Sequence, residues 1–333
     1  MIKMRFDTLS AWAMLVAATL LSGVTSNAAA QSSFPNRVMT FIWPFGPGTA
    51  NGEAFRVLAD EAGKVLGRPM ITEFRPGGGS RLGVTAVTAA PADGHLVAAG
   101  LDTIFTALPL MSPTFKAELG KDYAPVVLAV DSTPVWSSHP SLPFRDIKGL
   151  IAYAKANPGK LSFGSPGVGS WAHMTYEVFM DAAGGISMLH VPYKGSALAI
   201  PDRLSGLVNM YISGPDAAVP QIQQGQLIGL AVIHSQRLAA LPDMPTLAEA
   251  GVPQANLRNW VGIVTTPGTP QEIVMKLNGA FNAALKTQAV AKAMAAGGWL
   301  VNHGTTPEDM TRQIRSDAAV WGPIVRRLNL KAD

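Results

Sequence analysis

Short runs of β-branched and aromatic residues alternate with helical patterns along most of the chain, and this alternation limits the possible folds more than any other feature. The expected strands are residues 38–43, 70–73, 96–99, 126–130, 161–164, 188–191, 208–212 and 228–232. The expected helices between them are residues 52–66, 81–90, 171–182, 200–207 and 219–224. Such alternation is typical of an α/β protein with a mostly parallel sheet.

The C-terminal part of the sequence has a different pattern. A last strand is expected at residues 259–264, and the turn sequence at 267–270 then precedes helical patterns at 271–285, 288–297 and 307–328. With 333 residues, the chain is long enough for about two domains. We therefore expect two α/β units and a helical tail.

Composition excludes several classes of protein. Charged residues make up 14% of the chain, below the ~25% of an average domain, and hydrophobic residues make up 48%, which indicates a folded protein. The chain has no cysteine, which excludes a disulfide scaffold, a zinc–thiolate site and a thiol nucleophile. The net charge is +4 and no long run of Lys or Arg occurs, so no nucleic-acid partner is expected.

The first 30 residues have the three parts of a secretory signal peptide. Lys3 and Arg5 form a basic leader, residues 9–21 are mostly apolar, and small residues up to Ala30 offer a cleavage site before Gln31. The apolar stretch is shorter than the ~20 residues that a membrane-spanning helix needs. We expect cleavage after about Ala30 and export of the mature chain without a membrane anchor.

One local arrangement occurs twice, in different halves of the chain. The strand that ends at Trp43 runs into a glycine-rich loop at 44–49, the strand that ends near Phe163 runs into another at 164–170, and a helix follows each loop. Glycine lets the backbone approach a ligand closely, and the amino end of a helix attracts an anion. Two such loops could close on one anion from both sides, although glycine–proline connections that bind nothing are common in α/β proteins.

Other cofactor and metal motifs are weak. Residues 78–83 resemble the dinucleotide fingerprint but have Ser80 in place of its second glycine, and the six histidines include no pair at helical metal-ligand spacing. No metal and no cofactor are therefore expected. His173 could donate to an anion or be an ordinary surface or core histidine, and Arg75 and Arg81 could pair with a carboxylate or be solvated surface arginines.

A serine hydrolase is an alternative that the sequence leaves open. The segment 163–167 matches the Gly-x-Ser-x-Gly elbow except at its first glycine, which would make Ser165 the nucleophile. Pro166 lacks the backbone N–H that would serve the oxyanion, and this counts against hydrolysis. Residues that could act as the base or orient it are present, but no spacing selects them: His190, His234, Asp216 and Asp243.

Taken together, the motifs of the mature chain resemble the substrate-binding proteins of tripartite tricarboxylate transporters, also called the Bug family of periplasmic receptors. The resemblance runs from residue 34 to the C-terminal helix. It is carried by the segments 44–48, 75–79, 91–95, 165–170 with His173, 190–195, 241–246 with Glu249 and Gly251, Trp260 with Gly262, and 267–270. Single motifs are weak, whereas their order and spacing together are specific.

The resemblance implies an α/β fold of the type II periplasmic-binding-protein class, with two α/β lobes joined by two crossover strands and a ligand in the cleft. Lobe 1 would contain residues 31–131 and 259–333, including the C-terminal helices, and lobe 2 residues 132–258. The implied function is that of a periplasmic receptor, not an enzyme. It is expected to be a monomer that passes a small carboxylate to the membrane permease subunits of a tripartite tricarboxylate transporter.

In this family a ligand carboxylate is held largely by backbone amides and ordered water between the two glycine loops. Carried over to this chain, the implied ligand-binding residues are Phe45, Gly48, Thr49, Ala50 and Thr103 on lobe 1, and Ser165, Gly167, Gly169, Ser170, His173 and Ser213 on lobe 2.

Two departures from the family pattern bear on the ligand. Gly48 is not followed by the usual aspartate, and Ser213-Gly214 stand where the family commonly has Asp-Asn. Both changes remove negative charge near the cleft, which favours an anionic or partly aromatic ligand over an amino acid. A carboxylate sensor that signals to a membrane kinase is the alternative receptor function, because the same cleft would serve it.

Overall fold

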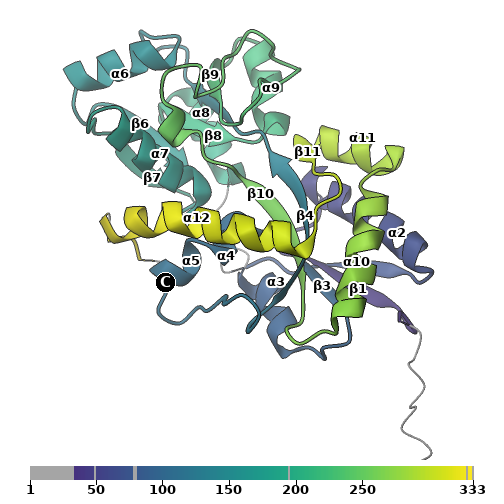
Figure 1. Cartoon of the computed structure of the whole chain (residues 1–333). Coiled ribbons are helices and arrows are strands. Elements are labelled where there is room, and N and C mark those ends of the chain that lie inside the picture. Colours follow the sequence, from purple (N-terminus) through teal and green to yellow (C-terminus); the bar gives the residue numbers. More distant parts are fainter. Residues whose placement is uncertain (1–33, 49, 78–80, 194–195, 328, 332–333) are drawn as a thin grey trace, which may run out of the picture.

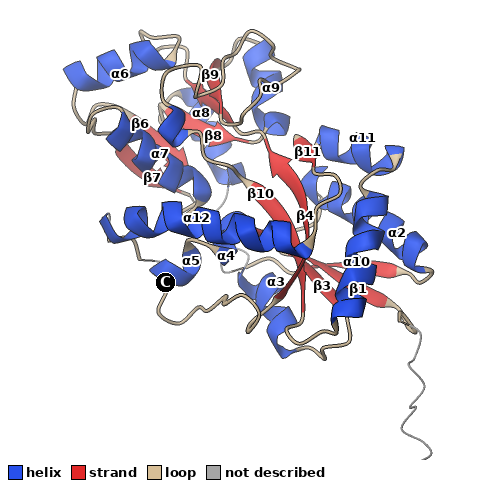
Figure 2. Cartoon of the chain, in the orientation of Figure 1, coloured by secondary structure: helices blue, strands red, loops and turns tan. Residues whose placement is uncertain are grey.

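The structure is a computed structural model that describes residues 34–48, 50–77, 81–193, 196–327 and 329–331. The expected signal peptide lies outside these ranges, as does Thr49 of the expected ligand site. Within them the chain forms two β-sheets, each flanked by helices (Figures 1 and 2). The expectation of an α/β protein with two units is confirmed.

A six-stranded sheet forms the first lobe, with the strand order β11-β4-β10-β3-β1-β2. Its strands are β1 (Met39–Trp43), β2 (Met70–Phe74), β3 (Leu96–Leu101), β4 (Ala124–Ser132), β10 (Trp260–Thr265) and β11 (Trp299–Val301). β1 is parallel to β2 and β3, whereas β10 is antiparallel to both β3 and β4. Strands β1 to β4 therefore all point in the same direction.

Helices cover both faces of this sheet, because side chains alternate between the faces along each strand. On one face, α2 (Ala50–Leu66), α10 (Gln271–Ala284) and α11 (Gln288–Ala296) enclose a core that includes Phe41 and Trp43 of β1. On the other face, Ile42 and Trp260 pack with residues of the segments that follow β2 and β3. The helices in those segments are α3 (Arg81–Thr85), η2 (Ala86–Ala89), α4 (Asp102–Phe105) and α5 (Leu108–Met111).

A five-stranded sheet forms the second lobe, with the strand order β7-β6-β8-β5-β9. Its strands are β5 (Val135–Ser138), β6 (Ser162–Ser165), β7 (Leu189–Pro192), β8 (Met210–Ser213) and β9 (Ile228–Val232). Its helices are α6 (Ile147–Ala156), α7 (Trp171–Ala182), η3 (Ser196–Ala199), α8 (Ile200–Ser205), α9 (Pro215–Gln223) and η4 (Pro253–Ala255). Aromatic rings of Trp136, Phe163, Tyr176 and Phe179 contact one another in the core beneath α7.

Two segments carry the chain between the lobes. β4 leads through residues 133–134 into β5, and the segment before β10 returns the chain to the first lobe (Figure 1). Because β4 runs in the same direction as β1 and β3, the carboxyl ends of these strands face the second lobe. β8 is antiparallel to β5 and parallel to β6, so the carboxyl ends of β6 and β8 face the first lobe. The loops that follow these strands in the two lobes therefore face one another.

Helix α12 (Pro307–Arg327) joins the lobes a third time (Figure 1). Its Met310 packs with Trp260 in the first lobe, whereas Trp321 belongs to the core of the second lobe. Its last residue, Arg327, forms a 2.8 Å ion pair with Asp181 of α7. Thus α12 contacts both lobes, and the lobe boundaries at residues 131 and 259 stay a prediction.

Several elements were not expected from the sequence. β5 has the sequence Val-Trp-Ser-Ser, in which half the residues are polar although all four are buried, and β11 has only three residues. α9 begins at Pro215 rather than near residue 219, because proline is favourable in the first turn of a helix. α7 has the expected bounds, since the Oγ of Ser170 caps it by accepting a hydrogen bond from the N–H of His173.

Candidate functional site

The residues expected to bind a ligand lie at the facing edges of the two sheets. In the first lobe they follow the carboxyl ends of β1 and β3, and in the second lobe they end or follow β6 and β8. The structure brings these positions to the boundary between the lobes: Phe45, Gly48, Ala50, Thr103, Ser165, Gly167, Gly169, Ser170, His173 and Ser213. Their contact with a ligand stays a prediction.

The lobes touch at two places next to these loops. A Cβ atom at Gly169, in the loop after β6, would lie 2.9 Å from Cε of Met111 in α5. A Cβ atom at Gly298, just before β11, would lie 2.6 Å from Cδ of Pro215, the first residue of α9. The end of the Met111 side chain can shift, whereas the ring of Pro215 is rigid, so the close approach of the lobes depends more on Gly298.

On the first lobe, the amino end of α2 is a group that favours a nearby anion. The loop before it starts at Phe45, whose ring lies 5.2 Å from that of Trp43. The first amides of a helix have no acceptor within the helix, and the helix dipole favours an anion there. The side chain of Asn51 is engaged with β11, because its Oδ1 accepts a 2.8 Å hydrogen bond from Nε1 of Trp299. This bond holds the end of α2 beside Gly298 and thus beside the second lobe.

Thr103 is held at the end of β3 by a buried acid. Its N–H donates a 2.7 Å hydrogen bond to Oδ1 of Asp102, which also lies 3.4 Å from Nδ2 of Asn259. Oδ2 of Asp102 has no hydrogen-bond partner among the described residues. Burial raises the pKa of Asp102 well above its usual range, with Asp317 and Asp131 adding to the effect.

Ser165 is fully buried and fixes the loop after β6. Its Oγ accepts a 3.2 Å hydrogen bond from the N–H of Gly167, donates to the carbonyl of Gly167 at 3.0 Å, and lies 2.7 Å from Nε2 of His190. If the proton of His190 is on Nε2, these contacts occupy the one donor and both acceptor positions of the Ser165 hydroxyl. Ser165 therefore fixes the loop after β6 through both backbone groups of Gly167.

His173 shapes the same loop from α7. Its Nδ1 accepts a 3.1 Å hydrogen bond from the N–H of Gly169, so its proton is on Nε2, which lies 3.5 Å from Oε1 of Glu177. Its ring stacks on that of His190 at 4.0 Å. Burial, together with the neighbouring His173, lowers the pKa of His190 to about 4, so the His190 ring is uncharged at neutral pH. The N–H groups of Trp171 and Ala172, in the first turn of α7, have no acceptor within the helix.

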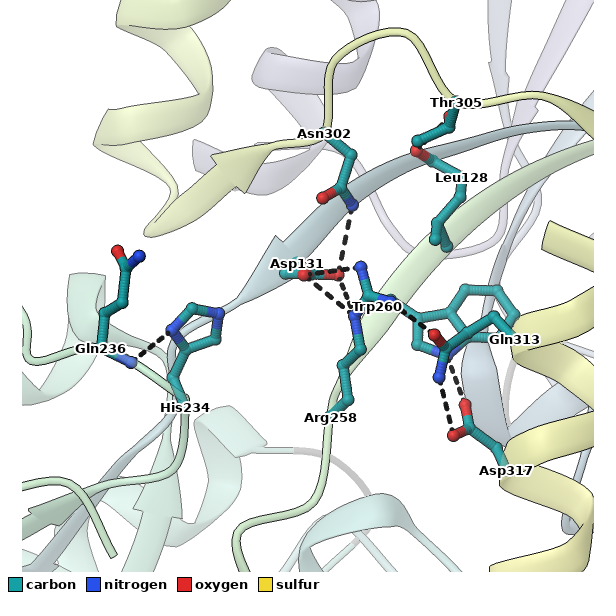
Figure 3. A network of polar contacts seen from close by, with 10 residues as sticks. All are labelled: Leu128, Asp131, His234, Gln236, Arg258, Trp260, Asn302, Thr305, Gln313 and Asp317. Atoms are coloured by element: carbon teal, nitrogen blue, oxygen red, sulfur yellow. Dashed lines mark hydrogen bonds and ion pairs between the residues drawn. The ribbon is translucent and has the colours of Figure 1, made fainter. Parts of the chain in front are cut away.

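A polar network that the sequence did not indicate lies where the chain crosses between the lobes (Figure 3). Nε of Arg258 lies 3.0 Å from both carboxylate oxygens of Asp131, and Nδ2 of Asn302 donates to the same carboxylate at 3.2 Å. Gln313 of α12 accepts from Arg258 and donates to Asp317 at 2.8 Å. The network thus links both crossover segments to β11 and α12.

One further candidate from the sequence has a local explanation. Arg75, considered as a partner for a ligand carboxylate, is paired with Glu73 at 2.6 Å. Among the described residues no group of three or more His, Asp or Glu side chains is placed to hold a metal ion.

Comparison with known proteins decides between the receptor and the enzyme. A family model described as the tripartite tricarboxylate transporter family receptor matches residues 54–330. The chain belongs to this receptor family. It is 32% identical to the protein BugT of Bordetella pertussis over 301 residues, which cover 90% of this chain and 91% of BugT. It is also 31% identical to a protein of Pseudomonas sp. strain P51, with coverage of 96% and 95%.

Solved structures of the receptor family share the fold. The periplasmic binding protein BugD has a TM-score of 0.76 and 26% identity, covering 90% of this chain and 99% of BugD. A Rhodopseudomonas palustris protein solved with adipate has a TM-score of 0.78 and 29% identity, with coverage of 90% and 99%. MatC from the same organism, with bound malate, has a TM-score of 0.75 and 26% identity, with coverage of 88% and 100%.

The protein is therefore a solute-binding receptor of the Bug type and not an enzyme, because the family and its solved members bind solutes. The buried Ser165 is consistent with this conclusion. The serine hydrolase alternative is set aside.

Proposed function

We propose that this receptor captures a small carboxylate between its lobes and delivers it to the permease of a tripartite tricarboxylate transporter. The observation that carries the proposal is the placement of two glycine-rich loops and the amino ends of α2 and α7 at the facing edges of the two sheets. An anion bound between these groups contacts both lobes only when the lobes are closed. Binding then shifts the population toward the closed state without any catalytic group.

The chemistry of the loops supports an anionic ligand without an ammonium group. The described residues 44–48 and 166–170 contain no acidic side chain that could pair with an ammonium ion. The relatives solved with adipate and malate bind dicarboxylates, which supports the same ligand class here. Aspartate and glutamate should accordingly bind more weakly than dicarboxylates that lack the amino group.

Delivery to a permease requires export to the periplasm. The family of periplasmic receptors and the N-terminal sequence both support export. In the part of the chain that the structure describes, no helix has the length and apolar character to span a bilayer. A chain purified from the periplasm should start at or close to Gln31, and a retained N-terminus would overturn this part. Ligand uptake by vesicles that contain the permease subunits should depend on the added receptor.

A thermal-shift screen of residues 31–333 tests the ligand class. The protein is first unfolded and refolded to remove carried-over ligand, and is then screened against mono-, di- and tricarboxylates and their amides. A ligand at 100 times its Kd adds about 2.7 kcal/mol of stability, which raises Tm by several degrees. Shifts with carboxylates but not with amides support the proposal. Shifts with amino acids alone, or with none of the compounds, contradict it.

A negative charge added at the amino end of α2 tests whether the ligand lies between the lobes. Ala50→Glu puts a carboxylate at an exposed position in the first turn of α2, where it favours the helix but repels an anionic ligand. We expect the affinity for the carboxylate found in the screen to fall by at least about tenfold. Gln271→Glu is the matched control, since it adds the same charge to the first turn of α10. α10 follows the antiparallel β10 and so begins at the opposite edge of the sheet.

A further inference from the structure

Arg203 of α8 is a buried arginine without an acidic partner. It is 2% exposed, and among the described residues no carboxylate forms an ion pair with it. Its Nη1 donates a 2.9 Å hydrogen bond to Oγ of Ser213, its Nη2 donates to Oε1 of Gln221, and its guanidinium lies 5.5 Å above the ring centre of Tyr211. Nε has no partner among the described residues. All these contacts are with uncharged groups.

The two acids close to Arg203 in the sequence are engaged elsewhere. Asp202 accepts a 2.7 Å hydrogen bond from the hydroxyl of Tyr193. Asp216 accepts hydrogen bonds from backbone N–H groups at the start of α9, and burial raises its pKa. A buried charge without a counter-charge is unfavourable, because the surrounding protein solvates it poorly. An anion brought close to Arg203 would therefore be stabilised more than the same anion on an open surface.

Ser213 connects this charge to the boundary between the lobes. It is the last residue of β8, and it pairs with Val135, where the chain enters the second lobe. Pro215, two residues further, touches the first lobe at Gly298. The Oγ of Ser213 accepts from Arg203, and its own proton has no acceptor among the described residues. A serine hydroxyl has one proton to donate, and here that proton is left for a ligand.

We propose that Arg203 is a specificity-determining residue, which orients the Ser213 hydroxyl toward one end of the bound ligand and selects a carboxylate at that end. The inference rests on the proposed function, because it concerns the same cleft. Arg203 acts through Ser213 and does not itself touch the ligand. A ligand held by the two glycine loops and by Ser213 carries a carboxylate at each end.

The test compares each dicarboxylate that shifts Tm in the screen with its mono-amide, by calorimetric titration. The wild-type protein is expected to prefer the dicarboxylate, and Arg203→Met should reduce this preference by at least about tenfold, which corresponds to about 1.4 kcal/mol. Arg203→Lys keeps the charge and should retain most of the preference. Ser213→Ala should lose as much as Arg203→Met, and the double variant should lose no more than either single one.

Arg145→Met is the matched control. Arg145 is an exposed arginine of the same lobe, and among the described residues its guanidinium donates to backbone carbonyls alone, including those of Leu142 and Phe144. Its replacement changes the net charge equally and should leave the preference intact.

The possible results separate this inference from the proposed function. An unchanged preference in Arg203→Met, or an equal loss for Arg145→Met, overturns the role of Arg203 and leaves the receptor function standing. If Arg203→Met does not fold, Ser213→Ala and Arg203→Lys decide in its place, and an unchanged preference in Ser213→Ala overturns the proposal. If the wild-type protein binds no carboxylate, the proposed function and this inference both fail.

Discussion

Arg258 and Asp131 hold the two crossover segments together: Nε of Arg258 lies 3.0 Å from each carboxylate oxygen of Asp131, and Nη2 lies 2.8 Å from Oδ2. Asp131 lies in β4, and Arg258 lies just before β10. The side chain of Asp131 is 11% exposed, so loss of its partner leaves a mostly buried charge.

We predict that Arg258→Met lowers the free energy of unfolding by about 2 kcal/mol, measured by chemical denaturation. Asp131→Asn removes the charge that would be left unpaired. The double variant should therefore lose less stability than the sum of the two single variants. Additive losses would show that the pair is not coupled.

The buried Asp102 predicts a fall in stability as the pH rises. Its folded pKa is raised well above the usual value, mainly by burial, whereas in the unfolded chain it ionises near its ordinary pKa of about 3.9. Above that pH the unfolded state has released a proton that the folded state still holds. The free energy of unfolding therefore falls as the pH rises. Asp102→Asn replaces the titrating carboxyl group with a neutral amide, so it should raise Tm at pH 8 more than at pH 4. Asp243→Asn, at an exposed carboxylate, is the control, and an equal response of the two variants would contradict the prediction.

The lowered pKa of His190 should make the protein less stable as the pH falls, which is opposite to the effect of Asp102. Burial and the neighbouring His173 lower the pKa of His190 from 6.5 to about 4. Between these pH values the unfolded chain binds a proton that the folded protein does not, so stability is complete above pH 6.5 and is lost as the pH falls toward 4. Solvent screening limits the effect at this half-buried ring to about 1 kcal/mol. His190→Gln should flatten the Tm profile in this window, whereas His303→Gln, on an exposed loop, should not.

Gly298 lets the first lobe approach Pro215 of the second lobe closely, and we predict that this contact stabilises the protein. Gly298 has a φ of +75°, and an added Cβ would meet Pro215 at 2.6 Å. Gly298→Ala should destabilise the protein through both the left-handed backbone and the contact with Pro215. Gly304→Ala is the matched control, since Gly304 has a φ of +69° and nothing within 4 Å of its added Cβ. The control should lose about 1 kcal/mol from backbone strain alone. If the two variants lose the same stability, the contact between Gly298 and Pro215 is unimportant.

Local sequence signals predicted much of the fold. α7 was predicted with its observed bounds because Ser170 provides a cap and the apolar residues follow a helical period. The two glycine-rich loops were predicted because each depends on neighbouring residues only. β5 was not predicted, because Ser137 and Ser138 are polar yet fully buried between two neighbouring strands. Burial of this kind depends on strands distant in the sequence.

The polar groups around the cleft could not be predicted in the same way. Asp131 and Arg258 are 127 positions apart, and no local pattern pairs them. Arginine is rarely fully buried, so no local pattern indicated that Arg203 lies in the interior. A polar residue at the end of an apolar strand, as at Asp131, is the one signal that could have indicated the network.

The position of α12 limits how the two lobes can move. Two crossover segments and α12 together tie the lobes at three points, so a twist of one lobe against the other would stretch at least one tie. A hinge rotation about the axis through these three connections stretches none of them. Pro323, near the second-lobe end of α12, leaves one carbonyl of the preceding turn without its helical partner, so the helix is locally easier to bend there. The lobes would then open and close by rotation about a single hinge axis.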